Sequence, residues 1–75
     1  MSDGGVRAKR LWRLRKLHDT VDAELREFPD GGIEVQFFYN GSLAYARRAT
    51  TRAEAIGEAS SRRAELEREG WNFHW

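Results

Sequence analysis

The dipeptide Asn40-Gly41 constrains this sequence more than any other feature. Asn followed by Gly tolerates the two positive φ angles of a type I′ turn, which joins adjacent antiparallel strands. A hairpin is therefore predicted across residues 33–47. Because a two-residue loop also fixes the register, we expect these residues to face each other: Phe38 and Leu43, Phe37 and Ala44, Gln36 and Tyr45, Val35 and Ala46, Glu34 and Arg47.

This register sorts the hairpin into two faces, since successive side chains of a strand point to opposite sides. Large apolar side chains and two alanines share one face, which leaves room for a helix: Ile33, Val35, Phe37, Tyr39, Ala44 and Ala46. The other face combines three apolar residues with a charge pair: Phe38, Leu43, Tyr45, Glu34 and Arg47. One helix covers one face only, so the second apolar group is a candidate contact surface.

A helix is predicted between Thr51 and Gly70. Thr51 and Glu54 have the spacing of a capping box. In this motif the Thr51 hydroxyl accepts a hydrogen bond from the Glu54 amide, and the Glu54 carboxylate accepts one from the Thr51 amide. Gly70 supplies the left-handed residue after the last turn, so Trp71 should pack on Leu66. The 18 residues between these signals contain no Pro and are rich in Ala, Glu and Arg, which favour helix. The expected apolar stripe is Ala53, Ile56, Ala59 and Leu66.

Residues 7–28 admit two interpretations. Their apolar residues fall at helical spacings of three and four, which gives the alternative order αββα. The alternation of polar and apolar residues in 12–15 and 21–26 has a period of two and favours two strands. A turn at His18-Asp19 would then place opposite charges across from each other: Arg13 with Glu24 and Arg15 with Asp22.

The predicted fold class is α+β, a four-stranded antiparallel β-meander followed by one C-terminal α-helix. The connection 30–32 is expected to be a three-residue loop with a left-handed glycine, which would place Leu25 beside Phe37. We expect residues 1–6 to be disordered and residues 7–75 to form a single domain. The aromatic tail 71–75 should dock on the sheet or on a sister subunit, and stacking on a ligand is the alternative.

Composition sets the broad class. A chain of 75 residues suits one domain of marginal size, and without disulfides its core must be dense or completed by a second copy, which favours a homodimer. The absence of Cys fits a reducing compartment. No apolar run reaches the roughly 18 residues of a membrane span, and the N-terminus does not resemble a signal peptide. A cytoplasmic location without membrane contact is expected.

The net charge of +1 conceals an asymmetry. Residues 1–17 contain six basic residues and one acidic residue, a net charge of +5, whereas the remainder has seven basic and eleven acidic residues, a net charge of −4. Such a basic segment on an acidic body suits phosphates or an acidic protein, although a solvated terminus that balances its own domain is an equal alternative.

No residue grouping predicts catalysis. The Ser, His and Asp residues lack a nucleophile elbow, and two His residues alone do not form a zinc site. The carboxylate pairs Glu54/Glu58 and Glu65/Glu69 suit a solvated helix face, and the Gly-Gly pairs lack the Lys of a phosphate loop. We therefore expect no enzyme, no cofactor, no metal and no small-molecule substrate.

Basic residues interleaved with aromatic residues on a sheet are the pattern that indicates a function. Bases would stack on the rings, at ~1–3 kcal/mol per base, while guanidinium groups meet phosphates. Asp22, Glu24 and Glu34 share this face, so a salt-bridged solvent face is the alternative. The predicted nucleic-acid or partner contacts are Arg7, Lys9, Arg10, Arg13, Arg15, Phe38, Leu43, Tyr45, Arg47 and Trp75.

The predicted order of elements over residues 11–70 resembles the repeat of Pur-alpha and Whirly proteins. This resemblance of topology implies single-stranded nucleic-acid binding by a dimer. The stretches Trp12-Arg13-Leu14-Arg15-Lys16 and Thr51-Arg52-Ala53-Glu54-Ala55, with Gly70-Trp71, look like small bacterial proteins, a likeness that implies no function. The first function predicted is a dimeric nucleic-acid-binding module. The alternative is a protein-protein interaction module, an adaptor or phage-type inhibitor that docks through the apolar sheet face and the aromatic tail.

Overall fold

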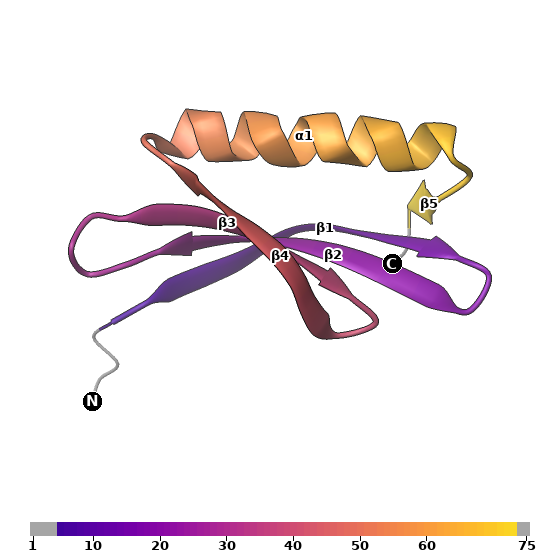
Figure 1. The fold of residues 1–75 in the computed structure, drawn as a ribbon, viewed down its shortest axis with the longest axis horizontal. Coiled ribbons are helices and arrows are strands. Elements are labelled where there is room, and N and C mark those ends of the chain that lie inside the picture. Colours follow the sequence, from indigo (N-terminus) through magenta and orange to yellow (C-terminus); the bar gives the residue numbers. More distant parts are fainter. Residues whose placement is uncertain (1–4, 74–75) are drawn as a thin grey trace.

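The computed structural model describes residues 5–73 and has the predicted α+β fold (Figure 1). Its elements in chain order are β1 (Arg7–Lys16), β2 (Asp19–Glu27), β3 (Ile33–Tyr39), β4 (Ser42–Ala49), α1 (Arg52–Arg68) and β5 (Asn72–Phe73). Strands β1 to β4 form the antiparallel meander, and the sheet order is β4-β3-β2-β1-β5. Residues 7–28 are therefore two strands, not a helix.

The core lies between α1 and one face of the sheet. The sheet contributes Trp12, Leu14, Ala23, Leu25, Val35 and Phe37, and the helix contributes Ala55, Ala59 and Leu66. Small helix residues allow a close approach, and the Trp12 indole Nε1–H donates a hydrogen bond of 3.1 Å to the Ala59 carbonyl. The predicted helix stripe is thus correct at Ala59 and Leu66. It is wrong at Ala53 and Ile56, which are exposed, because the stripe that meets the sheet begins at Ala55.

The helix ends are close to prediction. The Thr51 hydroxyl accepts a hydrogen bond from the Glu54 amide at 3.0 Å. The Glu54 carboxylate reaches back one residue further than expected, because it accepts from the Thr50 amide at 2.6 Å and the Thr50 hydroxyl at 2.8 Å. At the other end Gly70 has φ +100°, and the Trp71 amide donates to the Leu66 carbonyl at 3.0 Å, as a Schellman motif requires.

The first two connections place the correct faces together but in a register shifted by two residues. The β1–β2 turn is Leu17-His18 rather than His18-Asp19, so Arg13 faces Asp22 and Arg15 faces Thr20. Phe28 to Gly32 form the β2–β3 loop, closed by two backbone hydrogen bonds, and Leu25 therefore faces Val35 instead of Phe37. The predicted left-handed glycine is present, since Gly31 has φ +92°.

A β-bulge at Ala44 changes the third hairpin more deeply. Phe38 faces Leu43 as predicted, but beyond them the register slips by one residue and Tyr45 faces Phe37. A slip of one residue moves every following side chain to the opposite face. Tyr45 consequently stacks on Phe37 on the helix side, with ring centroids 4.8 Å apart, and Arg47 lies 3.7 Å from Glu58 of α1.

The expected place of Tyr45 and Arg47 on the helix-free face is therefore wrong, and so is the pairing of Glu34 with Arg47. Their places are taken by Ala46 and Arg48, of which Arg48 faces Glu34. The physical reason is burial, because the bulge lets the Tyr45 ring cover the fully buried Phe37 instead of facing solvent.

The start of the aromatic tail docks on its own sheet, as expected. Phe73 pairs with Leu14 and Asn72 pairs with Arg15, which makes β5 a short edge strand beside β1. The Arg63 guanidinium lies 4.5 Å from the centre of the Phe73 ring, and the Trp71 ring meets Tyr39 edge-on. Trp75 lies outside the described residues. Within the described part, α1 lacks the apolar length that crossing a membrane requires.

Candidate nucleic-acid interface

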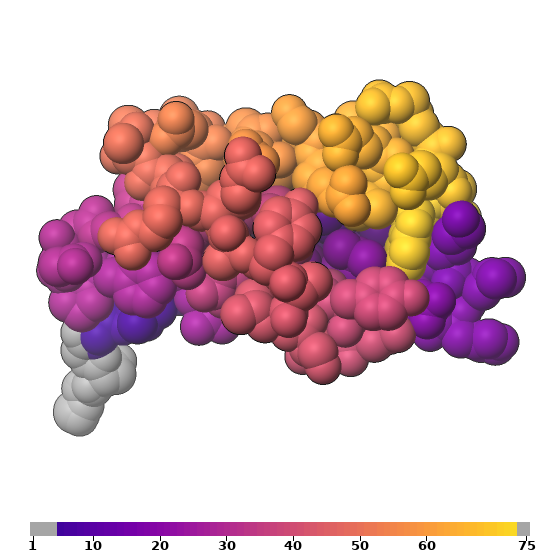
Figure 2. All heavy atoms as spheres, viewed as in Figure 1, coloured from indigo at the N-terminus to yellow at the C-terminus, as the bar shows by residue number. Residues whose placement is uncertain are grey.

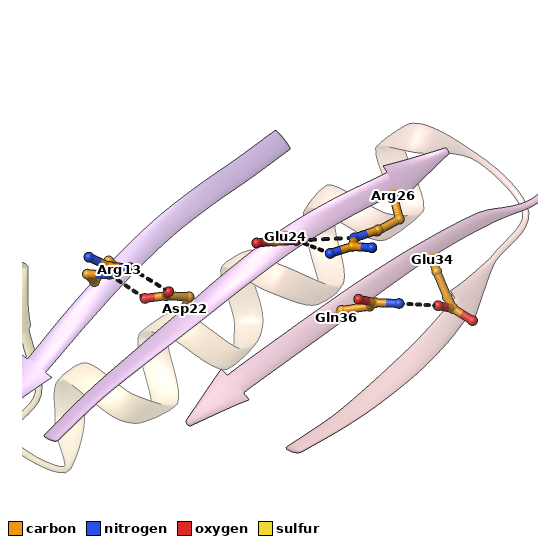
Figure 3. Close-up of polar contacts among 6 residues, drawn as sticks. All are labelled: Arg13, Asp22, Glu24, Arg26, Glu34 and Gln36. Carbon is orange, nitrogen blue, oxygen red and sulfur yellow. Dashed lines mark hydrogen bonds and ion pairs between the residues drawn. The ribbon is translucent and has the colours of Figure 1, made fainter. Parts of the chain in front are cut away.

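The helix-free face of the sheet is polar and largely satisfied by its own contacts (Figure 3). The Arg13 guanidinium donates two hydrogen bonds to Asp22, at 2.6 and 2.8 Å, and this bonding raises the pKa of Arg13 above its ordinary value. Arg26 donates two hydrogen bonds to the Glu24 carboxylate. Arg13, a predicted phosphate contact on this face, is therefore already committed to a carboxylate, and so is Arg26.

The apolar group predicted on this face is smaller than expected. Phe38 is half-buried and lies opposite Leu43, which is 55% exposed. Tyr45 has moved to the helix side, so Phe38 carries the one aromatic ring that the described strands place on this face. One half-buried ring is a poor platform for successive stacked bases.

Strand β1 contains the densest group of cations in the molecule. Six of its ten residues are Arg or Lys, and Arg13 is the member held by a carboxylate. Among residues 5–73, no carboxylate lies within ion-pair distance of five of these cations: Arg7, Lys9, Arg10, Arg15 and Lys16. We call these five residues the β1 cations.

The carboxylates that face the β1 cations across the strand pair are occupied elsewhere. Glu27, opposite Arg7, lies 3.5 Å from Arg52, and Glu24, opposite Arg10, accepts from Arg26. At the far end of the strand, Arg15 and Lys16 donate to the backbone carbonyls of Leu17 and Glu69, and the carboxylate of Asp19, opposite Lys16, accepts from Asn40. The result is a strip of positive potential along one strand.

A second β-bulge determines which of the β1 cations lie on which face. The register of β1 against β2 shifts at Leu11, between Arg10 and Trp12. Lys9 faces Leu25, a core residue on the helix side, whereas Arg10 faces Glu24 on the helix-free side. A strand of strict alternation would have placed Arg7 and Lys9 on the same face as Arg13 and Arg15.

The outer edge of β1 is open along most of its length. β5 pairs with Leu14 and Arg15 alone, so the backbone of residues 7–13, which pairs with β2 on its inner side, has no strand on its outer side in the described structure. Residues 6–10 are exposed. In Figure 1 this end of β1 extends away from α1, towards the N-terminus.

A shallow cavity of about 330 Å³ lies between the start of β1 and the β2–β3 loop. It is open to solvent, and its lining includes Arg7, Glu27, Phe28 and Ile33. The described residues contain no cluster of three His, Asp or Glu side chains placed to hold a metal ion. The cavity offers one cation and one carboxylate, which is no constellation for catalysis.

No protein-family model matches the chain, and no match was found among the curated proteins or the solved structures. Function is therefore inferred from geometry alone. Sequence reasoning missed Arg48, which takes the place predicted for Arg47, and Lys16, which faces α1. The missing signal was the position of the bulges, which depends on tertiary packing.

Proposed function

We propose that this chain is a small nucleic-acid-binding protein that holds the phosphate backbone with β1. The observation that carries the proposal is the set of β1 cations, five positive side chains on one strand with no carboxylate partner among the described residues. Phosphate contacts from Lys and Arg supply most of the affinity of non-specific nucleic-acid binding.

The mode of binding proposed is driven by charge rather than by stacking. Among the strands of residues 5–73, Phe38 is the one that offers a ring on the helix-free face, and Arg13 is held by Asp22. Contacts to phosphates position a protein but carry little sequence information. Binding should therefore show weak sequence preference and a steep dependence on salt.

Fluorescence anisotropy with labelled single-stranded and duplex oligonucleotides tests this proposal. We expect binding at about 50 mM salt that weakens by at least tenfold at about 200 mM, because counterions released on binding compete at higher salt. The triple variant Arg7→Gln/Lys9→Gln/Arg10→Gln should lose most of the affinity. Absence of binding to every oligonucleotide at the lower salt concentration would refute the proposal.

The proposal includes a homodimer. Strand β4 ends the sheet, and every residue from Ser42 to Arg48 is exposed. In the space-filling view, the residues of the β3–β4 hairpin lie at the front of the molecule, beneath α1 (Figure 2). An exposed edge strand is a template for pairing with another chain. Sedimentation equilibrium tests this part, and a monomer at all accessible concentrations would contradict it.

A protein-protein interaction module, as adaptor or inhibitor, is the second candidate. The observation in its favour is that Leu43 and Tyr45, 55% and 39% exposed, flank the open edge of β4 from its two faces. An apolar contact of this kind would persist at salt concentrations that abolish phosphate binding. The variant Phe38→Ser/Leu43→Ser should then release the partner and leave nucleic-acid affinity unchanged.

A further inference from the structure

We infer that the nucleic acid is duplex DNA, and that the N-terminal half of β1 enters its major groove edge first, with cations directed to both walls. This inference rests on the proposed function and adds the class of substrate. It comes from the two-sided arrangement of the β1 cations.

The bulge at Leu11 determines which of these cations share a face. Arg7 and Lys9 face the helix side of the sheet, and Arg10 and Arg15 face the helix-free side. Bulges in strands re-aim side chains at functional sites. A phosphate chain lying on one face would meet one of these pairs, whereas two phosphate chains on either side of the edge would meet both.

The charges of the helix-free face disfavour a nucleic acid laid flat on the sheet. Next to β1 on this face lie Asp22 and Glu24, each neutralised by one arginine. Glu34 follows on β3, where its carboxylate accepts a hydrogen bond from the neutral Gln36 and has no cation within ion-pair distance in the described chain (Figure 3). The phosphate backbone of a nucleic acid that crossed the sheet would approach the negative charge of Glu34. A phosphate backbone that ran beside the edge of β1 would not.

The edge is also accessible. Residues 7–13 have no neighbouring strand on their outer side within the described chain, and the four residues Arg7 to Arg10 are all exposed. The nearest covering element is β5, which begins to pair only at Leu14 and Arg15. Residues Arg7 to Arg10 are therefore free to enter a groove, and the exposed side chain of Arg15, which lies on the helix-free face, can meet a phosphate at the rim of the same groove.

The width of the nucleic-acid groove determines which ligand fits the β1 edge. The major groove of B-form DNA is about 12 Å wide and admits a two-stranded β-ribbon. β1 and β2 form the open edge of the five-stranded sheet, in which β2 also pairs with β3, and the outer strand β1 carries cations on both of its sides. The major groove of an RNA duplex is too narrow for side chains to read, and a single strand offers one row of phosphates. Duplex DNA is therefore the expected ligand.

The test compares two charge-matched variants. Arg7→Gln/Lys9→Gln removes the helix-side pair, and Arg10→Gln/Arg15→Gln removes the pair on the other face. The control, Arg62→Gln/Arg68→Gln, makes the same change in net charge on α1, where Arg62 is paired with Glu65. Affinity for a short DNA duplex, the corresponding RNA duplex and the separated DNA strand is measured between about 50 and 200 mM salt.

For duplex DNA, each of the two β1 variants should lower the slope of log K against log salt by about 2, since each lost phosphate contact removes about 0.9. The control should leave this slope unchanged, and the RNA duplex and the single strand should bind more weakly. If only one β1 variant changes the slope, or if single-stranded DNA or duplex RNA binds as tightly, the groove model is wrong and nucleic-acid binding stands. If none of the three ligands binds, the proposed function fails as well.

Discussion

Asp22 is the buried charged residue among residues 5–73, and it lies on the helix-free face. It is 9% exposed and accepts both hydrogen bonds of the Arg13 guanidinium. Asp22→Asn should lower the free energy of unfolding by about 1–2 kcal/mol, because hydrogen bonds to charged groups contribute about 1.5–3 kcal/mol and Arg13 is partly solvated.

Urea denaturation followed by circular dichroism measures this change. Glu24→Gln is the matched control, since the Glu24–Arg26 pair has a more exposed carboxylate, 26% against 12%. We expect the control to cost less than about 1 kcal/mol. A larger loss for Glu24→Gln than for Asp22→Asn would contradict this ranking.

The side chain of Trp12 connects the sheet to α1. Its indole N–H donates to the Ala59 carbonyl within the core, and its ring packs against Phe37. Trp12→Phe should cost about 1–3 kcal/mol of unfolding free energy, because a hydrogen bond is lost and a cavity remains. Trp71→Phe serves as the control at a half-buried position and should cost less in the same denaturation experiment. Equal losses would show that the interlayer hydrogen bond contributes nothing.

At the scale of the elements, two glycines of the α1 region should respond in opposite directions to the same substitution. Gly70 has φ +100°, so Gly70→Ala should destabilise the protein by about 1 kcal/mol. Gly57 lies inside the helix with no atom near the position of a new Cβ, so Gly57→Ala should stabilise it by about 0.5–1 kcal/mol. Thermal denaturation of the two variants provides the comparison. A rise in melting temperature for Gly70→Ala would refute the left-handed cap.

The start of α1 should make stability depend on pH. Hydrogen bonds from the Thr50 backbone amide, and then from its side chain, lower the pKa of Glu54 below its ordinary value. A carboxylate whose pKa is lowered in the folded state stabilises that state above its unfolded pKa, and the contribution disappears as the pH falls through the folded pKa.

The variant Glu54→Gln should therefore be less stable than the natural sequence at pH 7, and the difference should vanish on acidification below about pH 4. Urea midpoints of both proteins, measured from pH 7 to pH 3, give this difference directly. A difference that is independent of pH would show that the Glu54 carboxylate does not act through its charge.

The elements were more predictable from sequence than their registers. Local chemistry specified the turn at Asn40-Gly41, the cap at Thr51 and the left-handed Gly70, and all three are present. The bulges at Leu11 and Ala44 have no comparable local signal. At Ala44 the bulge lets the ring of Tyr45 gain burial against Phe37, a contact between strands that local patterns do not encode.

The residues of the candidate site were likewise easier to predict than their positions on the sheet. Its basic residues were identifiable from composition, because β1 holds most of the positive charge of the N-terminal segment. Which of them share a face was not predictable, since it follows from the bulge at Leu11. The same applies to Tyr45, whose ring was expected among the contacts and instead covers the core.

The whole molecule is a slab of two layers, 38 × 25 × 19 Å, in which α1 covers one side of the sheet (Figure 1). On its helix-free side, polar side chains are paired with one another. The two edges of the sheet differ in charge and in apolar content. The β4 edge is flanked by Leu43 and Tyr45, whereas the open part of β1 is basic. This division assigns self-association to β4 and nucleic-acid binding to β1 in the account proposed here.

A backbone amide NMR titration of the protein with a short DNA duplex at low salt tests the central claim most directly. We predict that the largest shift changes occur at residues 7–15 of β1, on both sides of the bulge, and that the amides of β4 and α1 change little. Shift changes concentrated on β4, or no change along β1 at saturating duplex, would contradict the assignment of β1 as the nucleic-acid interface.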